Sequence, residues 1–277
     1  MSEGIDILSG SRIGFIGCGA MAQALAGGLI AAGISATDLR GADLAPEQRK
    51  QFEAGLGVGT TSSNHALVAE CDVIVMCVKP NVVPIVLSAL DGTPELDQKL
   101  WISIAAGVGL GTYGAHLPDA TRVIRCMPNT PALVGAAATA LCPNTHASDA
   151  DLAIATALFS AVGTTWTTRI EEQLNAVTGL SGSGPAYVFL IIEALGEAGV
   201  KQGLPREAAY QLASQTVLGA AKLAIESGED PAVLRERVSS RGGTTIEGLK
   251  KLEAAGVAAA IDEAVAAAAE RSKALGS

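Results

Sequence analysis

The N-terminal part of the chain contains the stretch Ile13-Gly14-Phe15-Ile16-Gly17-Cys18-Gly19-Ala20-Met21-Ala22, from which the fold is predicted. Its first four residues have the character of a buried strand, and the rest matches G-x-G-x-x-A at the head of a helix. Gly17 permits a tight turn, Gly19 lets the backbone approach a pyrophosphate, and Ala22 allows close packing of helix on strand. The helix N-terminus also favours phosphate charge. The stretch therefore predicts a dinucleotide-binding turn, and a glycine-rich turn without a ligand is the alternative.

On both sides of this turn, from Arg12 to about Arg169, short apolar runs alternate with helical segments. This alternation is typical of a mostly parallel sheet covered by crossover helices, so the fold class is α/β. The run Val73–Val78 is apolar throughout, which indicates burial on both faces of the sheet. The predicted strands are Ile13–Ile16, Leu39–Ala42, Val73–Val78, Trp101–Ile104, Val123–Cys126, Ala138–Leu141 and Thr164–Thr167, with helices at Ala20–Ala32, Glu47–Ala54, Val82–Leu90 and Asp149–Ala161.

After Glu171 the strand signal disappears and the chain reads as successive helices. The change of period predicts a domain boundary, with an α/β domain over residues 1–169 that carries the dinucleotide-binding turn and an all-helical domain over residues 170–277; the family resemblance described below implies a Rossmann-type NAD(P)-binding role for the first and a dimerisation and substrate-binding role for the second. The segment Gly184–Gln202 is apolar over much of its circumference, and such a helix is commonly buried against a partner, so we expect an intimate homodimer built from the second half. The predicted helices are Glu171–Thr178, Gly184–Gln202, Arg206–Ser227, Pro231–Ser239, Thr245–Ala255 and Val257–Leu275.

The composition excludes several classes of protein. Apolar residues make up 49% and charged residues 17% of the 277 residues, which excludes low-complexity disorder. The net charge of −9 argues against a nucleic-acid binder and against an anionic membrane surface. Long uncharged stretches are interrupted by Gly, Pro, Asn or Ser, and the N-terminus carries acids rather than a basic region, so we expect neither a membrane span nor a secretory signal. The five cysteines include no C-x-x-C pair, which predicts reduced thiols, a cytoplasmic location and no metal site.

A second constellation of residues lies at Ser239-Ser240-Arg241-Gly242-Gly243-Thr244-Thr245-Ile246-Glu247. Thr244 and Glu247 have the spacing of a capping box, so one interpretation is simply a well-started helix. The other is a small carboxylate held by backbone N–H groups at the helix N-terminus, among two glycines and several hydroxyls. The two interpretations are compatible.

A third feature, Thr178–Val188, resembles the G-x-x-G-x-G-x-x-x-K arrangement of β-hydroxyacid dehydrogenases, in which the lysine takes part in proton transfer. Val188 stands at the lysine position here, so a carbonyl-reducing site would lack its acid. An imine is far more basic than a carbonyl and can arrive protonated. Hydride addition to C=N therefore requires positioning and a hydrogen-bond partner more than a proton donor.

The nicotinamide specificity has two interpretations. The second strand ends at Asp43, and an acid there suits a ribose hydroxyl and NAD. Arg40, Arg49 and Lys50 lie nearby and would suit a 2′-phosphate, although basic residues on the following helix more often form only a solvated face. Cys18 lies inside the phosphate turn, and we interpret it as a small filler residue because nothing near it in the sequence activates a thiolate.

These motifs together resemble the pyrroline-5-carboxylate reductases, which make proline in the last step of its synthesis. The resemblance runs nearly end to end, and the last two of its motifs are highly specific. The motifs are Gly14–Met21, Val78-Lys79-Pro80, Ser103–Gly107, Arg125-Cys126-Met127-Pro128-Asn129-Thr130-Pro131, Ala176–Tyr187 and Ser239–Glu247.

The resemblance implies a Rossmann-type domain followed by a helical dimerisation domain, with the active site between the cofactor domain of one subunit and helices of its partner, and assemblies that are often decamers. It implies NADPH as cofactor, with NADH as the alternative. The substrate carboxylate would lie on the backbone of Gly242, Gly243, Thr244 and Thr245, with the Thr245 hydroxyl facing the ring nitrogen and Ser240 as a second catalytic hydroxyl. The dinucleotide would touch Gly17, Gly19, Ala20, Met21, Asn64, Val78, Lys79 and Pro80, with Ala105, Ala106 and Gly107 near the nicotinamide.

One position departs from the family: Arg241 stands where proline is usual, which removes the rigidity of that turn and adds a guanidinium beside the expected carboxylate site. Two other functions are carried as alternatives. A β-hydroxyacid dehydrogenase-like oxidoreductase is disfavoured by Val188, and a non-catalytic dinucleotide-sensing protein is disfavoured by the intact Ser239–Thr245 stretch.

Overall fold

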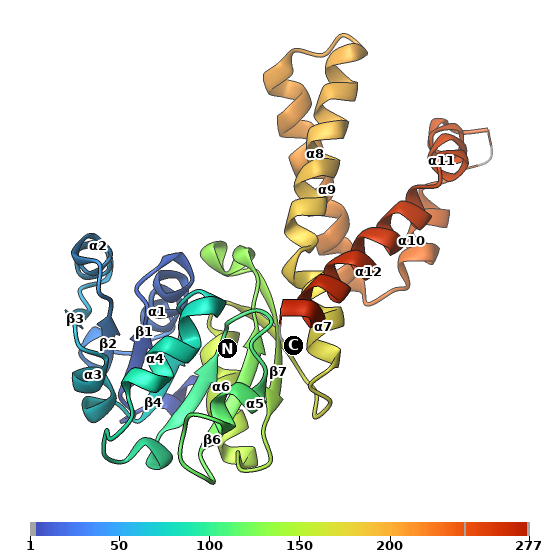
Figure 1. The fold of residues 1–277 in the computed structure, drawn as a ribbon. Coiled ribbons are helices and arrows are strands. Elements are labelled where there is room, and N and C mark those ends of the chain that lie inside the picture. The colour runs from blue at the N-terminus through green and yellow to red at the C-terminus, as the bar shows by residue number, and fades with distance from the viewer. Residues whose placement is uncertain (1–3, 241, 276–277) are drawn as a thin grey trace. The chain divides into compact units, whose positions relative to one another are not determined.

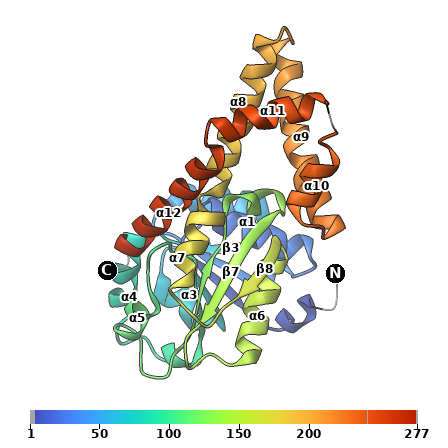
Figure 2. The same ribbon diagram turned by 90° about the vertical axis from the view of Figure 1, so that its right-hand side faces the viewer.

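The computed structural model describes residues 4–240 and 242–275, drawn in Figures 1 and 2. These residues form two compact units, the first made of residues 4–183 with 267–275 and the second of residues 184–266. Arg241, where the sequence departs from the family, lies outside the described residues.

The first unit is built on an eight-stranded sheet with the order β3-β2-β1-β4-β5-β6-β7-β8. Every neighbouring pair is parallel except β6 and β7, which are antiparallel. After β3 the chain crosses to the other half of the sheet and forms β4 beside β1. The strand order therefore reverses between β1 and β4, which is the topological switch point of a dinucleotide-binding fold. The strands are β1 Ile13–Ile16, β2 Leu39–Ala42, β3 Gly59–Thr61, β4 Val73–Met76, β5 Leu100–Ser103, β6 Arg122–Met127, β7 Ala137–Pro143 and β8 Gly163–Thr167.

Helices cover both faces of this sheet, and Figure 2 shows α1 and α6 on one side with α4 and α5 on the other. Alternate strand residues supply the two cores: Val73 and Val75 pack with α1 and α6, whereas Ile74 and Met76 pack with α3, α4 and α5. The burial on both faces expected for Val73–Val78 is confirmed for Val73–Met76, whereas Cys77 and Val78 are half-buried. The helices are α1 Ala20–Ala31, α2 Pro46–Leu56, α3 Asn64–Glu70, α4 Val83–Ala89, α5 Leu110–Gly114, α6 Asp149–Ser160 and α7 Gln173–Val177, with short 3-10 turns at Ile5–Leu8, Ala36–Asp38, Pro80–Val82, Leu96–Gln98 and Thr130–Val134.

The structure confirms the α/β class and all the predicted strands, with small shifts at their ends. It adds β3, α3 and α5, which were not predicted. β3 is a three-residue edge strand of glycine and threonine, so it lacks the apolar run by which strands were recognised. α3 and α5 span only seven and five residues, too few for a helical period to be visible.

The first unit extends beyond the boundary expected after residue 169. Leu174 of α7 is fully buried and packs in one core with Ala140 and Cys142 of β7. A π-helical stretch, Thr178–Gly182, follows α7. The last turns of the chain also belong to this unit, since the Ser272 hydroxyl bonds the Asn175 side chain at 2.9 Å. The packing of α7 on the sheet therefore sets the division between the two units. The change of period in the sequence does not reveal this packing.

The second unit consists of helices only within the described part of the chain. α8 and α9 pack against each other along their length, where Gly196 lies against the Tyr210 ring and Gly199 against Ala209. Tyr210 donates a hydrogen bond of 2.7 Å to Glu197. The helices are α8 Gly184–Lys201, α9 Arg206–Ser227, α10 Pro231–Arg237, α11 Thr244–Ala254 and α12 Val257–Leu275, whose last turns lie in the first unit.

Large apolar side chains of α8 are uncovered in the single chain: Phe189 is 63% and Leu190 64% exposed. A patch of this kind marks a protein–protein contact. No helix among residues 4–240 and 242–275 is long and apolar enough to cross a membrane.

Candidate functional site

The glycine turn joins β1 to α1 in a conformation that fits its predicted role. Gly17 has φ of 96°, and a Cβ there would lie 3.0 Å from the carbonyl carbon and oxygen of Cys77, so only glycine fits. Its N–H donates to the carbonyl oxygen of Ala42 at 2.7 Å, which ties the turn to the end of β2. No atom of the described residues lies within 4 Å of the Cβ position of Gly19, so the backbone there faces open space. The turn thus offers the approach that a pyrophosphate needs.

The predicted cofactor-binding residues all follow the carboxyl ends of parallel strands. Gly17–Met21 follow β1, Asn64 follows β3, Val78–Pro80 follow β4 and Ala105–Gly107 follow β5. These strands lie side by side, since β1 pairs with both β2 and β4, and β4 pairs with β5. Ligands of open α/β sheets bind outside the carboxyl ends of the strands at the switch point. The fold therefore gathers these residues along one edge of the sheet.

Asp43 binds the glycine turn itself. Its Oδ2 accepts from the Cys18 N–H at 2.9 Å, and its Oδ1 accepts from the Ala45 N–H at 2.9 Å. Nη1 of Arg49 donates to the carbonyl oxygens of Asp43 and Leu44, at 2.7 and 3.2 Å. The Asp43 carboxylate, expected to bind a ribose hydroxyl, thus accepts hydrogen bonds from backbone N–H groups. The Arg49 guanidinium lies beside it.

Two family motifs of the first unit meet at Asn129. Its Nδ2 donates to the Ser181 carbonyl oxygen at 3.0 Å, and its Oδ1 accepts from the Ala138 N–H at 3.0 Å. Gly182 lies against Met127, where a Cβ would come within 2.6 Å of the methionine methyl group. Gly182 therefore serves close packing on the end of β6.

In the second unit, α11 begins differently from the predicted capping box. Gly243 is the N-cap and has no side chain to cap the helix, Thr244 is the first helical residue, and Glu247 pairs with Lys250 at 2.7 Å. The capping-box interpretation of Thr244 and Glu247 is therefore wrong, because the helix starts at Thr244, one residue earlier than such a box requires. The Gly243 N–H donates to the Ser240 carbonyl oxygen at 2.9 Å. Thr244 and Thr245, both exposed, thus open a helix that lacks a side-chain cap.

The thiols are not reactive groups of this site. All five cysteines are free. Burial, with a smaller contribution from the Asp43 carboxylate, raises the pKa of Cys18 to about 12. Burial likewise raises the pKa of Cys71 to about 12. Cys18 thus fills space in the turn, as expected. Within residues 4–240 and 242–275, no group of three or more His, Cys, Asp or Glu could hold a metal ion.

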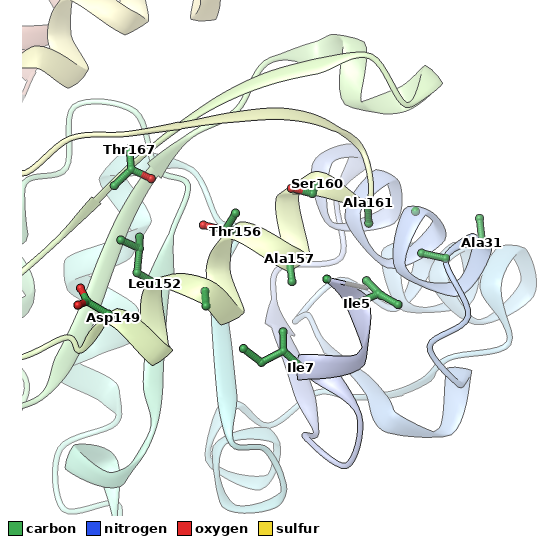
Figure 3. Close-up of a pocket in the computed structure, with 14 residues that line it drawn as sticks. Ile5, Ile7, Ala31, Asp149, Leu152, Thr156, Ala157, Ser160, Ala161 and Thr167 are labelled. Atoms are coloured by element: carbon green, nitrogen blue, oxygen red, sulfur yellow. The ribbon is translucent and has the colours of Figure 1, made fainter. Parts of the chain in front are cut away.

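A large open groove of about 1450 Å³ lies away from these residues, between α1, α6 and the 3-10 turn Ile5–Leu8. Figure 3 shows Leu152, Thr156 and Ala157 of α6 along it. Among the described residues that line it, Asp149 is the one that carries a charge, and it pairs with Arg169 at 2.8 Å. The described lining residues do not form the converging polar groups of a ligand site.

Comparison with known proteins agrees with this geometry. Residues 12–107 match the family model described as NADP oxidoreductase coenzyme F420-dependent, and residues 171–275 match pyrroline-5-carboxylate reductase dimerisation. The chain is 46% identical over 271 residues to pyrroline-5-carboxylate reductase of Methanosarcina acetivorans, covering 97% of this chain and 99% of that protein. The structure of a pyrroline-5-carboxylate reductase from Coxiella burnetii is similar, with a TM-score of 0.90 and 38% identity over 96% of this chain and 99% of that one. The NADP-bound pyrroline carboxylate reductase of Plasmodium falciparum has a TM-score of 0.86 and 34% identity, covering 97% and 99%.

The Rossmann-like sheet, the glycine turn and the helical dimerisation region define a nicotinamide-dinucleotide-dependent oxidoreductase that forms homo-oligomers. The relatives extend over nearly the whole chain, so both units belong to one known enzyme architecture. The chain belongs to the pyrroline-5-carboxylate reductase family.

Proposed function

We propose that this protein reduces the cyclic imine 1-pyrroline-5-carboxylate to L-proline with NADPH. The observation that carries the proposal is the glycine turn, whose geometry leaves room for a pyrophosphate, in a chain of this family. The open space beside Gly19 fits a dinucleotide, because a Cβ would occupy the volume that a phosphate needs. A bound reduced nicotinamide would supply the hydride.

In this proposal the glycine turn holds the pyrophosphate, and the segments after the neighbouring strands contact the two halves of the dinucleotide. The N–H groups at the start of α1, including those of Ala20 and Met21, face the phosphates. Asn64 and the end of β2 lie on the adenosine side of the switch point. Val78–Pro80 and Ala105–Gly107 lie on the nicotinamide side, because β4 and β5 lie beyond β1 in the sheet.

We infer a preference for NADPH over NADH from the surroundings of Asp43. Both of its carboxylate oxygens accept backbone N–H groups, which weakens its ability to bind ribose hydroxyls. Arg49, anchored on the carbonyl oxygens of residues 43 and 44, carries a positive charge to the same place and suits a 2′-phosphate. An acidic residue that binds its own loop and an adjacent guanidinium together favour the phosphorylated cofactor.

The substrate carboxylate is assigned to the start of α11. Gly242 and Gly243 form the turn before the helix, and the N–H groups of Thr244 and Thr245 are the donors, because the Gly243 N–H already serves Ser240. The helix dipole adds to the attraction for an anion. The carboxylate thereby fixes the orientation of the ring.

The Thr245 hydroxyl is assigned to the ring nitrogen. The protonated imine donates its N–H to this hydroxyl oxygen, the imine carbon receives the hydride, and the C=N π electrons become the nitrogen lone pair. The N–H proton is already present in the substrate, so no strong side-chain acid is required. Ser240 is assigned as a second hydroxyl that supports this hydrogen bonding.

The homo-oligomer is assigned as a dimer built on the second unit, or an assembly of such dimers up to a decamer, and its compartment as the cytoplasm, where five unpaired thiols stay reduced. Sedimentation velocity distinguishes the dimer from the decamer.

The test of the proposed function is NADPH oxidation with 1-pyrroline-5-carboxylate, compared with NADH, in wild type and three Thr245 variants. Thr245→Val and Thr245→Ala remove a hydrogen bond to a charged group worth about 1.5–3 kcal/mol, so kcat/KM falls roughly 10- to 150-fold. Thr245→Ser keeps the hydroxyl and most of the activity. Wild-type rates in folded Thr245→Val would remove the hydroxyl from the mechanism, and no turnover by wild type would overturn the proposed reaction.

A further inference from the structure

We propose that Glu171 is a positioning residue that holds the loop after β5, residues 104–109, in the shape that receives the nicotinamide half of the cofactor. The inference rests on the proposed function, since that function assigns Ala105–Gly107 to the nicotinamide. It adds a residue from outside every motif of the resemblance, at the start of the segment that follows β8.

One oxygen of Glu171 joins the far end of this loop to the sheet. Oε1 accepts from the Leu110 backbone N–H at 2.7 Å and from Nη1 of Arg125 at 2.8 Å. Leu110 is the first residue of α5, and its N-cap Gly109 has no side chain to cap the helix. Glu171 therefore supplies the acceptor that the local sequence lacks. The same oxygen lies 3.4 Å from the Cβ position of Gly109, so the carboxylate contacts the loop closely.

Arg125 gives this contact its stiffness. It stands on the central strand β6, and its side chain is only 7% exposed. A buried guanidinium must be paired, because an uncompensated charge in the interior is strongly destabilising. The need to neutralise Arg125 thus keeps the Glu171 carboxylate in place, and the carboxylate in turn keeps the end of the loop in place.

The rest of the loop is held from two other directions. The Ser103 hydroxyl oxygen accepts from the Tyr113 hydroxyl at 2.7 Å and from the Ala105 N–H at 3.4 Å, which fixes the start of the loop on α5. Gly107, with φ of 76°, lies under the last turn of α12, where a Cβ would come within 2.8 Å of Leu275 Cβ. With both its start and its middle fixed, the end of the loop at Leu110 is the point at which Glu171 controls its shape.

The loop follows β5, and because of this position its contact with Glu171 bears on cofactor binding. In the proposed binding mode the glycine turn after β1 holds the pyrophosphate, in the middle of the dinucleotide. β2 lies on the adenosine side of this turn, and β4 and β5 lie on the nicotinamide side. A shift of the loop after β5 therefore affects the nicotinamide half and leaves the adenosine half in place. Loss of a purely structural residue would instead change the affinity for both halves of the dinucleotide or for neither.

The experiment measures two dissociation constants by calorimetry, one for NADP⁺ and one for the adenosine-half probe 2′,5′-ADP, together with kcat. In Glu171→Ala we expect NADP⁺ affinity to fall about tenfold with unchanged 2′,5′-ADP affinity, and kcat to fall about 10- to 100-fold from misplacement of the reacting ring. Glu171→Gln keeps an acceptor for the Leu110 N–H and should restore most of both values.

The matched control is Asp151→Ala. Asp151 is a buried carboxylate that pairs with Arg122 of the same strand β6 at 2.7 Å and caps α6, away from the loop. Its loss should lower Tm and leave the NADP⁺ to 2′,5′-ADP affinity ratio unchanged. If Glu171→Ala fails to fold, the double variant Arg125→Met with Glu171→Leu takes its place. It removes both charges and still lacks an acceptor for the Leu110 N–H, so we expect the same fall in the NADP⁺ to 2′,5′-ADP affinity ratio.

A wild-type NADP⁺ to 2′,5′-ADP affinity ratio and a wild-type kcat in folded Glu171→Ala, or in the double variant that replaces it, would overturn this inference while leaving the proposed function standing. The inference would also be overturned if Asp151→Ala lowered the NADP⁺ to 2′,5′-ADP affinity ratio as much as Glu171→Ala does, because the change would then reflect general destabilisation. Failure of the wild type to bind NADP⁺ or 2′,5′-ADP would overturn the proposed function and this inference with it.

Discussion

The substitution Gly19→Asp tests the dinucleotide site without disturbing the fold. Gly19 is the N-cap of α1, with φ of −72° and ψ of −175°, an extended conformation that any residue adopts. Within residues 4–240 and 242–275 no atom lies within 4 Å of its Cβ position, so a side chain meets no clash there. Aspartate is a favoured N-cap residue. The variant should therefore have a Tm at or slightly above that of the wild type.

The cost appears when the cofactor binds. The new carboxylate stands where the pyrophosphate approaches the backbone, and two unit charges of the same sign about 4 Å apart repel by about 4 kcal/mol at an effective dielectric constant near 20. That energy corresponds to about a thousandfold loss of affinity. Raising the ionic strength should shrink the loss, because the charges are partly exposed and salt screens them.

The assay is calorimetric titration of NADP⁺ into wild type, Gly19→Asp and Gly19→Asn, with Tm measured on each. Asparagine has the shape of aspartate without its charge, so the difference between these two variants isolates the electrostatic contribution. An unchanged dissociation constant in a folded Gly19→Asp protein would refute the assignment of the glycine turn. Equal losses in both variants would refute the electrostatic part of the reasoning.

Four further predictions follow from other contacts. Gly17→Ala should lower the free energy of unfolding by about 1–3 kcal/mol, measured by denaturant titration, because φ of 96° is strained for alanine. Arg49→Gln should weaken NADPH about tenfold and leave NADH unchanged, since only NADPH carries the 2′-phosphate; equal effects in steady-state kinetics would contradict the assignment. Cys18 and Cys71, with pKa values raised to about 12, are protonated thiols below that pH, so a disulfide reagent at pH 8 should modify them only after unfolding. Phe189→Asp should dissociate the homo-oligomer in sedimentation experiments, because it places a charge on the exposed apolar face of α8; an unaltered sedimentation coefficient would place the interface elsewhere.

The candidate site was predictable in part, and the reason is local. The positive φ at Gly17 and the apolar strand before it are short-range features, so the motif indicates the geometry that the structure shows. The start of α11 was less predictable. Thr244 and Glu247 have the right spacing for a capping box, but a shift of one residue in the helix start makes Gly243 the N-cap and leaves Glu247 to pair with Lys250.

The charged residue Arg125 inside an apolar strand was a signal that a buried partner must exist. The sequence does not say which acid supplies it, because Glu171 lies 46 residues away and reaches Arg125 only when α7 packs on the sheet. The same holds for Asp43, whose two hydrogen bonds to backbone N–H groups depend on the turn after β1 meeting the end of β2.

By itself the sequence determined the α/β class, the glycine turn, the strand and helix periods and the switch to an all-helical second half, because each is a short-range pattern of apolar side chains and turn residues. Only the tertiary structure decided the antiparallel pairing of β6 with β7, the edge strand β3, the inclusion of α7 and the end of α12 in the first unit, and the Arg125–Glu171 pair. These features are contacts between segments distant in the chain. Their energies depend on which groups the folded backbone brings together, and no local pattern carries that information.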